Sequence, residues 1–168
     1  MKKPIFWEKA KKDLIKSDKK LGNIIKNYPN DFLFSKSDPF YTISRSIVGQ
    51  QISVKAAQAV WDKVEKKLKK ISPNYVNKSH FMTLKSCGLS HQKIKYLKAL
   101  SVAFMKKEID PTNWSNLSDE QIVNELIKVK GVGRWTAEMF LIFNLCRPDI
   151  FPVDDIGLIK GICNCYKL

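Results

Sequence analysis

Apolar residues recur along the chain mainly at helical spacing, three or four positions apart, and no tract alternates apolar with polar residues between turns. This period is typical of amphipathic helices, whereas half-buried strands repeat every second residue. The sequence therefore predicts an all-α protein. A chain of 168 residues has room for one domain with a real core, arranged in one or two lobes.

Four of the expected helices have recognisable starts, after Asp38, Ser53, Ser90 and Ser118. Asp38 precedes a proline, which favours the first helical position, and Ser118 with Gln121 forms a capping-box pattern. The buried positions that we expect in these helices are, in order, Phe40, Ile43, Ile47 and Val48; Ala56, Ala57, Val60 and Val64; Ile94, Leu97, Leu100 and Phe104; and Ile122, Val123, Leu126 and Ile127.

Charge is distributed unevenly along the chain. The net charge is +14, and residues 1–110 carry 24 Lys and Arg against 9 Asp and Glu, whereas residues 111–168 carry 6 against 7. An excess of this size indicates a polyanionic partner, with the basic part supplying most of the phosphate contacts. A genome whose base composition favours lysine codons would give the same excess, so charge alone does not identify nucleic acid.

Composition argues against several classes of protein. No apolar run approaches the roughly 20 residues of a membrane span, and the first residues mix charged with apolar positions, so we expect a cytoplasmic protein. The spacings of Cys87, Cys146, Cys163 and Cys165 suit neither a zinc site nor an iron–sulfur loop. We therefore expect reduced thiols, mostly in the core, and no iron–sulfur cluster.

The most informative segment is residues 126–141, in which Gly131-Val132-Gly133 separates two helical patterns. Glycines at both ends of the turn let backbone N–H groups approach a phosphate, and the second helix adds its positive N-terminal dipole. Such a hairpin would hold a nucleic-acid backbone without reading its sequence. The alternative is an ordinary turn in which Gly131 only ends the first helix.

Three segments carry more information together than separately. They are residues 46–53 (Ser-Ile-Val-Gly-Gln-Gln-Ile-Ser), residues 87–90 (Cys-Gly-Leu-Ser), and residues 130–137 (Lys-Gly-Val-Gly-Arg-Trp-Thr-Ala) followed by residues 151–155 (Phe-Pro-Val-Asp-Asp). In order and spacing this set resembles the helix-hairpin-helix (HhH-GPD) DNA glycosylases, and within them the alkylpurine (3-methyladenine II) branch. The resemblance implies helical lobes flanking a cleft that holds the DNA and the active site.

The resemblance implies that Asp155, the second carboxylate of its pair, is catalytic. It precedes the apolar positions Ile156, Leu158 and Ile159, and backbone dipoles at a helix N-terminus keep a carboxylate ionised. An ionised carboxylate beside an extruded nucleotide would stabilise an oxocarbenium-like sugar and orient the attacking water. We expect Asp154 to be only a helix cap; the alternative is that both aspartates are caps.

Position 135 bears on the mechanism. Members of this family that also cut the DNA backbone carry a lysine there, whose amine forms a Schiff base with the sugar. This chain has Trp135, so the resemblance implies base removal without strand cleavage. The indole face would stack on a cationic alkylated base, and we place Trp135 and Met139 in the base pocket. The alternative for Trp135 is a core aromatic residue.

The resemblance also assigns contacts with DNA. The turn at residues 49–52 would supply the wedge that fills the space of the extruded base, with Gln51 as the wedge and Gln50 as a supporting contact. The other DNA-binding residues that we expect are Ser53, Gly131, Val132, Gly133, Arg134 and Thr136. The same resemblance implies a Na⁺ or K⁺ ion on the backbone carbonyls of Ile127, Val129 and Val132, and no other cofactor.

We expect a single domain over residues 1–168: an N-terminal helical segment at 1–35, a central lobe at 36–150 with the hairpin at 127–136, and the catalytic aspartate loop with the start of a C-terminal lobe at 151–168. The family usually closes with further helices beyond the point where this sequence ends. We therefore expect an incomplete C-terminal lobe.

The sequence thus predicts a monofunctional DNA glycosylase that hydrolyses the N-glycosidic bond of alkylated bases, such as 3-methyladenine and 7-methylguanine, in base excision repair. We expect a monomer that acts on double-stranded DNA, associated with the nucleoid in a bacterium. The alternatives are a glycosylase for other damaged or mismatched bases and a non-catalytic DNA-binding module with the same hairpin. An RNA-binding protein fits less well, because the sequence shows neither an aromatic platform nor a Gly-x-x-Gly clamp.

Overall fold

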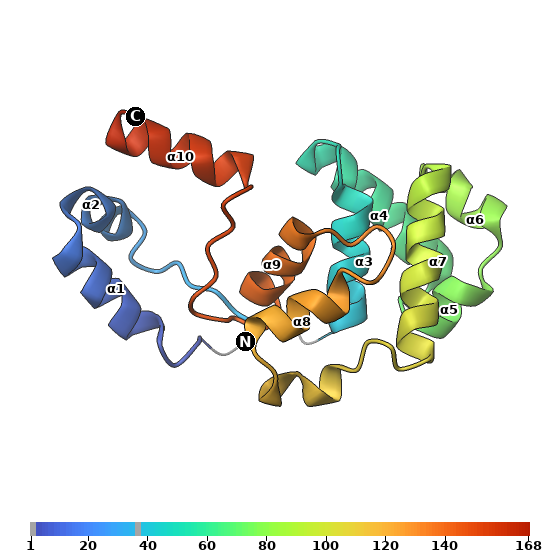
Figure 1. The fold of residues 1–168 in the computed structure, drawn as a ribbon. Helices are drawn as coiled ribbons and strands as arrows, with labels where there is room; N and C mark the ends of the chain where they lie inside the picture. Colours follow the sequence, from blue (N-terminus) through green and yellow to red (C-terminus); the bar gives the residue numbers. More distant parts are fainter. Residues whose placement is uncertain (1–2, 36–37) are drawn as a thin grey trace.

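The computed structural model describes residues 3–35 and 38–168, and within them it contains helices and no strands, which confirms the all-α prediction (Figure 1). None of the described helices has the length and hydropathy needed to cross a membrane. In chain order the helices are α1 (Trp7–Ser17), α2 (Lys19–Asn27), α3 (Pro39–Gly49), α4 (Val54–Leu68), α5 (Pro73–Lys78), α6 (Phe81–Ser86), α7 (His91–Met105), the 3₁₀ helix η1 (Pro111–Asn116), α8 (Asp119–Leu126), α9 (Arg134–Phe143) and α10 (Ile156–Tyr166).

Helices α3 and α7 form the centre of the main body. Helix α3 packs against α4, α7 and α9, and α7 also packs against α5 and α6. The side chains of Ile47, Leu100 and Leu141, one from each of α3, α7 and α9, are fully buried. Burial of one such side chain contributes about 1.5–3 kcal/mol, so these three helices form a rigid frame.

The four predicted helix starts are confirmed by their caps. Asp38 accepts a hydrogen bond from the backbone N–H of Tyr41 at 2.9 Å, and Ser53 and Ser90 cap α4 and α7 in the same way. Ser118 and Gln121 form the complete capping box, with a hydrogen bond in each direction. Local chemistry therefore sets where these helices begin.

Two of the predicted buried faces need correction. In α4, Ala56 is exposed, and the core contact is made by Trp61, Val64 and Leu68. The indole N–H of Trp61 donates to the Tyr41 hydroxyl of α3 at 3.0 Å, so the contact with α3 includes Trp61, which the sequence analysis did not list. Ile127 is 41% exposed because α8 has already ended at Leu126 and the chain turns into the hairpin. Phe104, Ala57 and Val60 are only half-buried.

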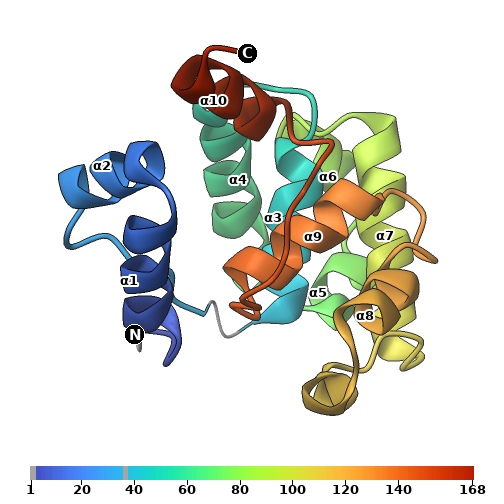
Figure 2. The same ribbon diagram turned by 60° about the vertical axis from the view of Figure 1, so that its left-hand side comes forward.

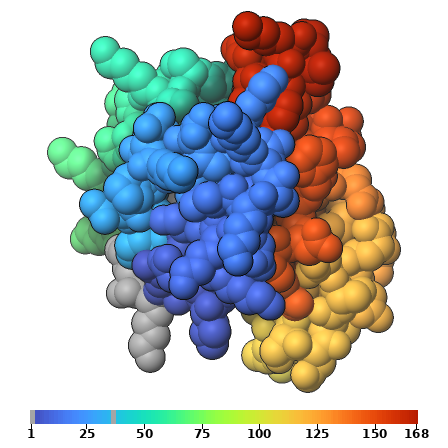
Figure 3. Space-filling model, turned by 90° about the vertical axis from the view of Figure 1, so that its left-hand side faces the viewer, coloured from blue at the N-terminus to red at the C-terminus, as the bar shows by residue number. Residues whose placement is uncertain are grey.

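Helices α1 and α2 pack on each other, to one side of the main body (Figures 1 and 2), and lie beside α10 (Figure 3). The Tyr166 hydroxyl of α10 donates to Asp18, the N-cap of α2, at 2.7 Å, and the Lys20 ammonium lies over the Tyr166 ring. No residue of α10 is buried, and the apolar side chains of Ile156 and Ile159 are exposed.

The cysteine prediction is partly wrong. All four cysteines are free thiols, but only Cys87, at the end of α6, lies in the core, and Cys146, Cys163 and Cys165 are half-buried. Two of the latter are on α10, which packs less tightly than the main body.

Candidate functional site

Between α8 and α9 the chain forms the helix, turn and helix that the sequence predicted. Within the turn, the N–H of Val129 donates to Leu126 O at 3.1 Å, and the N–H of Val132 donates to Val129 O at 3.0 Å. The side chains of Val129 and Val132 are buried in the core. The turn is therefore fixed from behind by apolar packing, and its backbone faces outward.

The two glycines of the hairpin have different reasons to be glycine. Gly131 has φ +94°, and a Cβ there would lie 2.1 Å from Cγ of Tyr96 on α7. Gly133 has an ordinary φ of −90°, and a Cβ there would meet nothing within 4 Å. Gly131 is thus required by the fold itself, whereas the space beside Gly133 is open to an approaching molecule.

The N-terminus of α9 has features that favour binding of an anion. Gly133 is the N-cap, and no side chain caps this helix. Because the first N–H groups of any α-helix lack intrahelical partners, those of the first turn of α9 remain available. Together with the helix dipole they favour a phosphate at this end.

A cavity of about 380 Å³ lies in front of the hairpin. Three separate parts of the chain line it: the turn between α3 and α4, the start of α7, and the hairpin. We call it the hairpin cavity, and its residues are Gln50, Gln51, Ser90, Gln92, Lys93, Tyr96, Gly131, Val132 and Gly133. The fold therefore brings the three sequence segments that carry the resemblance to one place.

The two neighbouring glutamines of the α3–α4 turn face different directions. The Gln50 amide donates to Gly131 O at 3.0 Å and lies 3.3 Å from the Thr136 hydroxyl. Gln51 has φ +58° and an exposed side chain. Gln50 therefore points inward to the hairpin, and Gln51 points outward, as a wedge would.

Two of the predicted DNA contacts are already engaged within the protein. The Thr136 side chain is buried and meets Gln50, so its hydroxyl faces inward. Ser53 is exposed, but its hydroxyl accepts the hydrogen bond from Ala56 N that caps α4. The sequence predicted the helix start at Ser53, whereas the contact of Thr136 with Gln50 joins residues 86 positions apart and was not predicted.

Arg134, one of the expected DNA-binding residues, is paired with two carboxylates within the protein. Its guanidinium donates to both carboxylate oxygens of Glu120 on α8, at 3.1 and 2.8 Å, and its Nε donates to Glu138 at 3.1 Å. The guanidinium lowers the pKa of Glu120 below its usual range. Two carboxylates thus surround the one arginine of the hairpin, and this group ties α8 to α9.

The chain between α9 and α10 runs back alongside α9 (Figure 2). Arg147 holds this connection in place by donating to Trp114 O at 2.7 Å and Leu117 O at 3.2 Å, and by pairing with Asp119 at 3.3 Å. The start of α10 therefore returns to the start of α9.

Asp155 lies at this meeting point. It is the N-cap of α10, where one carboxylate oxygen accepts from Leu158 N at 2.7 Å and the other accepts from the Trp135 indole N–H at 2.7 Å. The Leu158 N–H, and after it the Trp135 N–H, hold the pKa of Asp155 below its usual value. Asp154 is exposed and is not the cap that we expected; one residue, Asp155, both caps the helix and presents the ionised carboxylate.

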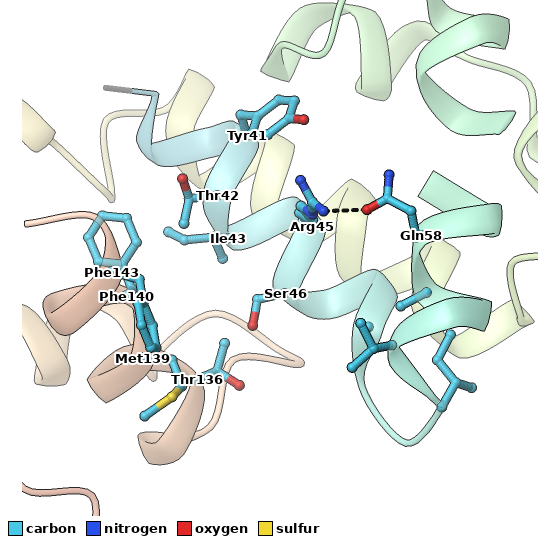
Figure 4. Close-up of a pocket in the computed structure, with 14 residues that line it drawn as sticks. Tyr41, Thr42, Ile43, Arg45, Ser46, Gln58, Thr136, Met139, Phe140 and Phe143 are labelled. Atoms are coloured by element: carbon cyan, nitrogen blue, oxygen red, sulfur yellow. Dashed lines mark hydrogen bonds between the residues drawn. The ribbon is translucent and has the colours of Figure 1, made fainter. Parts of the chain in front are cut away.

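A second cavity, of about 300 Å³, lies between α3, the start of α4 and α9 (Figure 4). Met139 and Phe143 of α9 line one side, and Arg45 of α3 with its hydrogen-bond partner Gln58 of α4 lies on the other. Trp135, one turn before Met139, is not part of its lining. The two residues predicted for the base pocket therefore share a helix face but have different surroundings.

The sequence analysis missed Lys93 and Tyr96 of the hairpin cavity. The Lys93 ammonium donates to Val48 O, near the C-terminus of α3, at 2.7 Å, and its burial lowers its pKa. A lysine in the first turn of a helix is opposed by the helix dipole, and Lys93 stands where a capping box has Glu or Gln. That position was a readable signal, whereas nothing local marked Tyr96.

Known DNA repair proteins are similar in sequence to this chain. Residues 44–168 match the family described as HhH-GPD superfamily base excision DNA repair protein. The chain is 33% identical to DNA-3-methyladenine glycosylase 1 of Schizosaccharomyces pombe, over 89% of this chain and 68% of that protein, and 32% identical to DNA-3-methyladenine glycosylase of Saccharomyces cerevisiae, over 88% and 56%. The chain thus spans only part of each relative.

A solved structure gives the same result for the fold. The 3-methyladenine DNA glycosylase of Schizosaccharomyces pombe, in complex with abasic DNA, superimposes with a TM-score of 0.84 at 29% identity, over 95% of this chain and 81% of that one. The hairpin, the turn at residues 49–53 and the start of α10 all fall within the matched family region.

Proposed function

Because the chain belongs to the HhH-GPD superfamily of base excision DNA repair proteins, we propose that it removes alkylated bases from double-stranded DNA as a monofunctional glycosylase. The observation that carries this proposal is the hydrogen bond from Trp135 to Asp155. This hydrogen bond orients the carboxylate and helps to keep it ionised, which supports the proposal because glycosidic cleavage needs negative charge near the sugar.

Different residues carry the three steps of the proposed reaction: DNA binding, base extrusion and cleavage of the glycosidic bond. The hairpin backbone at Gly133 and the first turn of α9 bind a phosphate and fix the register of the duplex. Gln51 fills the space left by the extruded nucleotide. Asp155 stabilises positive charge on the sugar as the base departs and orients the water that attacks it. One chain carries all three parts, and we propose that it acts as a monomer.

We propose that the reaction ends at the abasic site. A lyase needs an amine that attacks the sugar carbon, and position 135 offers an indole instead, whose N–H is donated to Asp155. Trp135 is 40% exposed, and we propose that its indole stacks on the base. A cationic base alkylated at a ring nitrogen gains about 0.5–2 kcal/mol from an aromatic face, and the relatives are named for 3-methyladenine.

The hairpin also has donors suited to a monovalent cation. Backbone carbonyl oxygens are hard, uncharged ligands, which suit Na⁺ or K⁺ better than a transition metal. Within the described residues no cluster of three or more His, Cys, Asp or Glu side chains could hold a metal ion. We propose that the carbonyls of Ile127, Val129 and Val132 hold the cation and that it adds positive charge beside the phosphate. Duplex affinity should then fall when tetramethylammonium replaces K⁺ at equal ionic strength.

A base-release experiment tests the proposed function. A duplex with a single 7-methylguanine is incubated with the protein, then analysed with and without alkaline cleavage of abasic sites. We expect strand breaks only after alkali, and no covalent complex on addition of borohydride. Release of no base from any alkylated duplex would refute the glycosylase, and efficient borohydride trapping would refute the monofunctional assignment.

A further inference from the structure

The turn that presents Gln51 is held on both sides by side chains from elsewhere in the fold. Before it, Val48 O accepts a hydrogen bond from the Lys93 ammonium of α7 at 2.7 Å. After Gly49, the Gln50 amide donates to Gly131 O of the hairpin at 3.0 Å. Gln51 follows directly, so the wedge position is connected to α7 on one side and to the hairpin on the other.

Lys93 is well suited to this contact. The last carbonyl groups of a helix lack intrahelical partners and attract positive charge, and Val48 is the second-last residue of α3. Lys93 extends from α7, whose neighbouring residues Ile94 and Leu97 are buried in the core. Lys93 is half-buried, and its ammonium donates to Val48 O at 2.7 Å, so the contact is partly shielded from solvent.

Gln51 has a backbone conformation that needs such support. It has φ +58°, a region that residues other than glycine rarely adopt. Residues in such conformations persist where the surrounding structure fixes them. The contacts of Gln50 and Lys93 fix the backbone here. Neither side chain has a part in the proposed phosphate binding or in the proposed reaction at Asp155.

We propose that Lys93 and Gln50 are positioning residues for base extrusion, which hold the backbone around Gln51 at a fixed distance from the hairpin. The phosphate bound at Gly133 and the plug inserted by Gln51 then belong to one rigid unit, and insertion costs little conformational entropy. This inference rests on the proposed function, since it concerns how the same site extrudes its base.

The test measures extrusion separately from excision. A duplex with 7-methylguanine beside 2-aminopurine reports extrusion by fluorescence, in an Asp155→Asn background that does not release the base. Lys93→Met keeps the aliphatic stem and loses the ammonium, and we expect the extrusion equilibrium to fall about tenfold, as for a lost charged hydrogen bond. Lys93→Arg should restore most of it. Lys95→Met removes the same charge from an exposed position of α7 and should leave extrusion unchanged.

A double-mutant cycle shows whether Lys93 influences extrusion through Gln51. If Lys93 acts through Gln51, then Lys93→Met in a Gln51→Ala protein should lower extrusion less than about twofold further. Gln50→Leu should behave like Lys93→Met, and it serves as the second variant if Lys93→Met does not fold. Independent, multiplying effects of Lys93 and Gln51, or equal losses in Lys93→Met and Lys95→Met, would overturn the proposal. Base release by the wild-type protein would stand in either case.

Discussion

The two ends of the proposed site are held by different physical means. The hairpin rests on the core, with the side chains of Val129 and Val132 buried behind it and Tyr96 packed against Gly131. Asp155 begins a helix that has no buried side chain, and its carboxylate is held by hydrogen bonds from Leu158 and Trp135.

This difference lets the proposed binding of DNA be tested separately from the proposed removal of the base. A group fixed by packing is disturbed mainly by changes of volume, whereas a group fixed by two hydrogen bonds depends on each donor. Variants of the hairpin should therefore change stability or affinity, and variants around Asp155 should change rate and its pH dependence. The predictions below test this separation.

The largest effect should follow Asp155→Asn, which keeps the shape of the side chain and loses its charge. Base release in a single turnover should fall by about a thousandfold, the upper range for loss of one electrostatic contact. Binding to undamaged duplex should persist or tighten, because a negative charge near the phosphates is removed. Asp154→Asn is the matched control, since that neighbour is exposed and caps nothing. An equal loss of base-release rate in both variants would contradict the catalytic role of Asp155.

The hairpin glycines should respond in opposite ways. Gly131→Ala places a Cβ against Tyr96 at a positive φ and should lower the free energy of unfolding by about 3 kcal/mol. Gly133→Asp meets no neighbour and places a favoured residue at an N-cap, so thermal stability should hold or rise. Its charge should nevertheless weaken binding to every duplex about equally. Normal duplex binding by Gly133→Asp would contradict the assignment of the hairpin.

A moderate effect should follow Trp135→Phe, which removes the indole donor to Asp155. Because that hydrogen bond lowers the pKa of Asp155, the pKa should rise toward its usual value in the variant. Excision requires the ionised carboxylate. As the pH falls, the excision rate of the variant should therefore begin to decrease at a higher pH than that of the wild type. Leu158 N–H, the larger cause, remains and limits the shift. Single-turnover rates across pH measure it, and Met139→Leu, which keeps the indole, should leave the profile unchanged.

The smallest effect concerns the arginine of the hairpin. Duplex affinity should fall linearly with salt in a log–log plot. Arg134→Gln should hardly change that slope, since Glu120 and Glu138 already compensate the charge. Lys130→Gln, at an exposed lysine just before the glycines, should reduce the slope by about one if it contacts a phosphate. A larger change for Arg134 would show that DNA displaces its carboxylate partners.

Much of the fold follows from short stretches of sequence. The caps at Asp38, Ser53, Ser90 and Ser118 depend on residues no more than three positions away, and the turn with Gly131 and Gly133 is equally local. The buried face of α4 was not predictable in the same way. Trp61 donates to Tyr41 of another helix, and this contact joins residues 20 positions apart.

The site shows the same division. By itself the sequence determined the types of group present: glycines in a tight turn, a carboxylate before a helix, and an indole at position 135. Only the tertiary structure decided their partners, since Trp135 and Asp155 are 20 residues apart, Arg134 and Glu120 are 14 apart, and Gln50 and Gly131 are 81 apart. Capping is a contact within one turn, whereas these pairs form only after whole helices have packed.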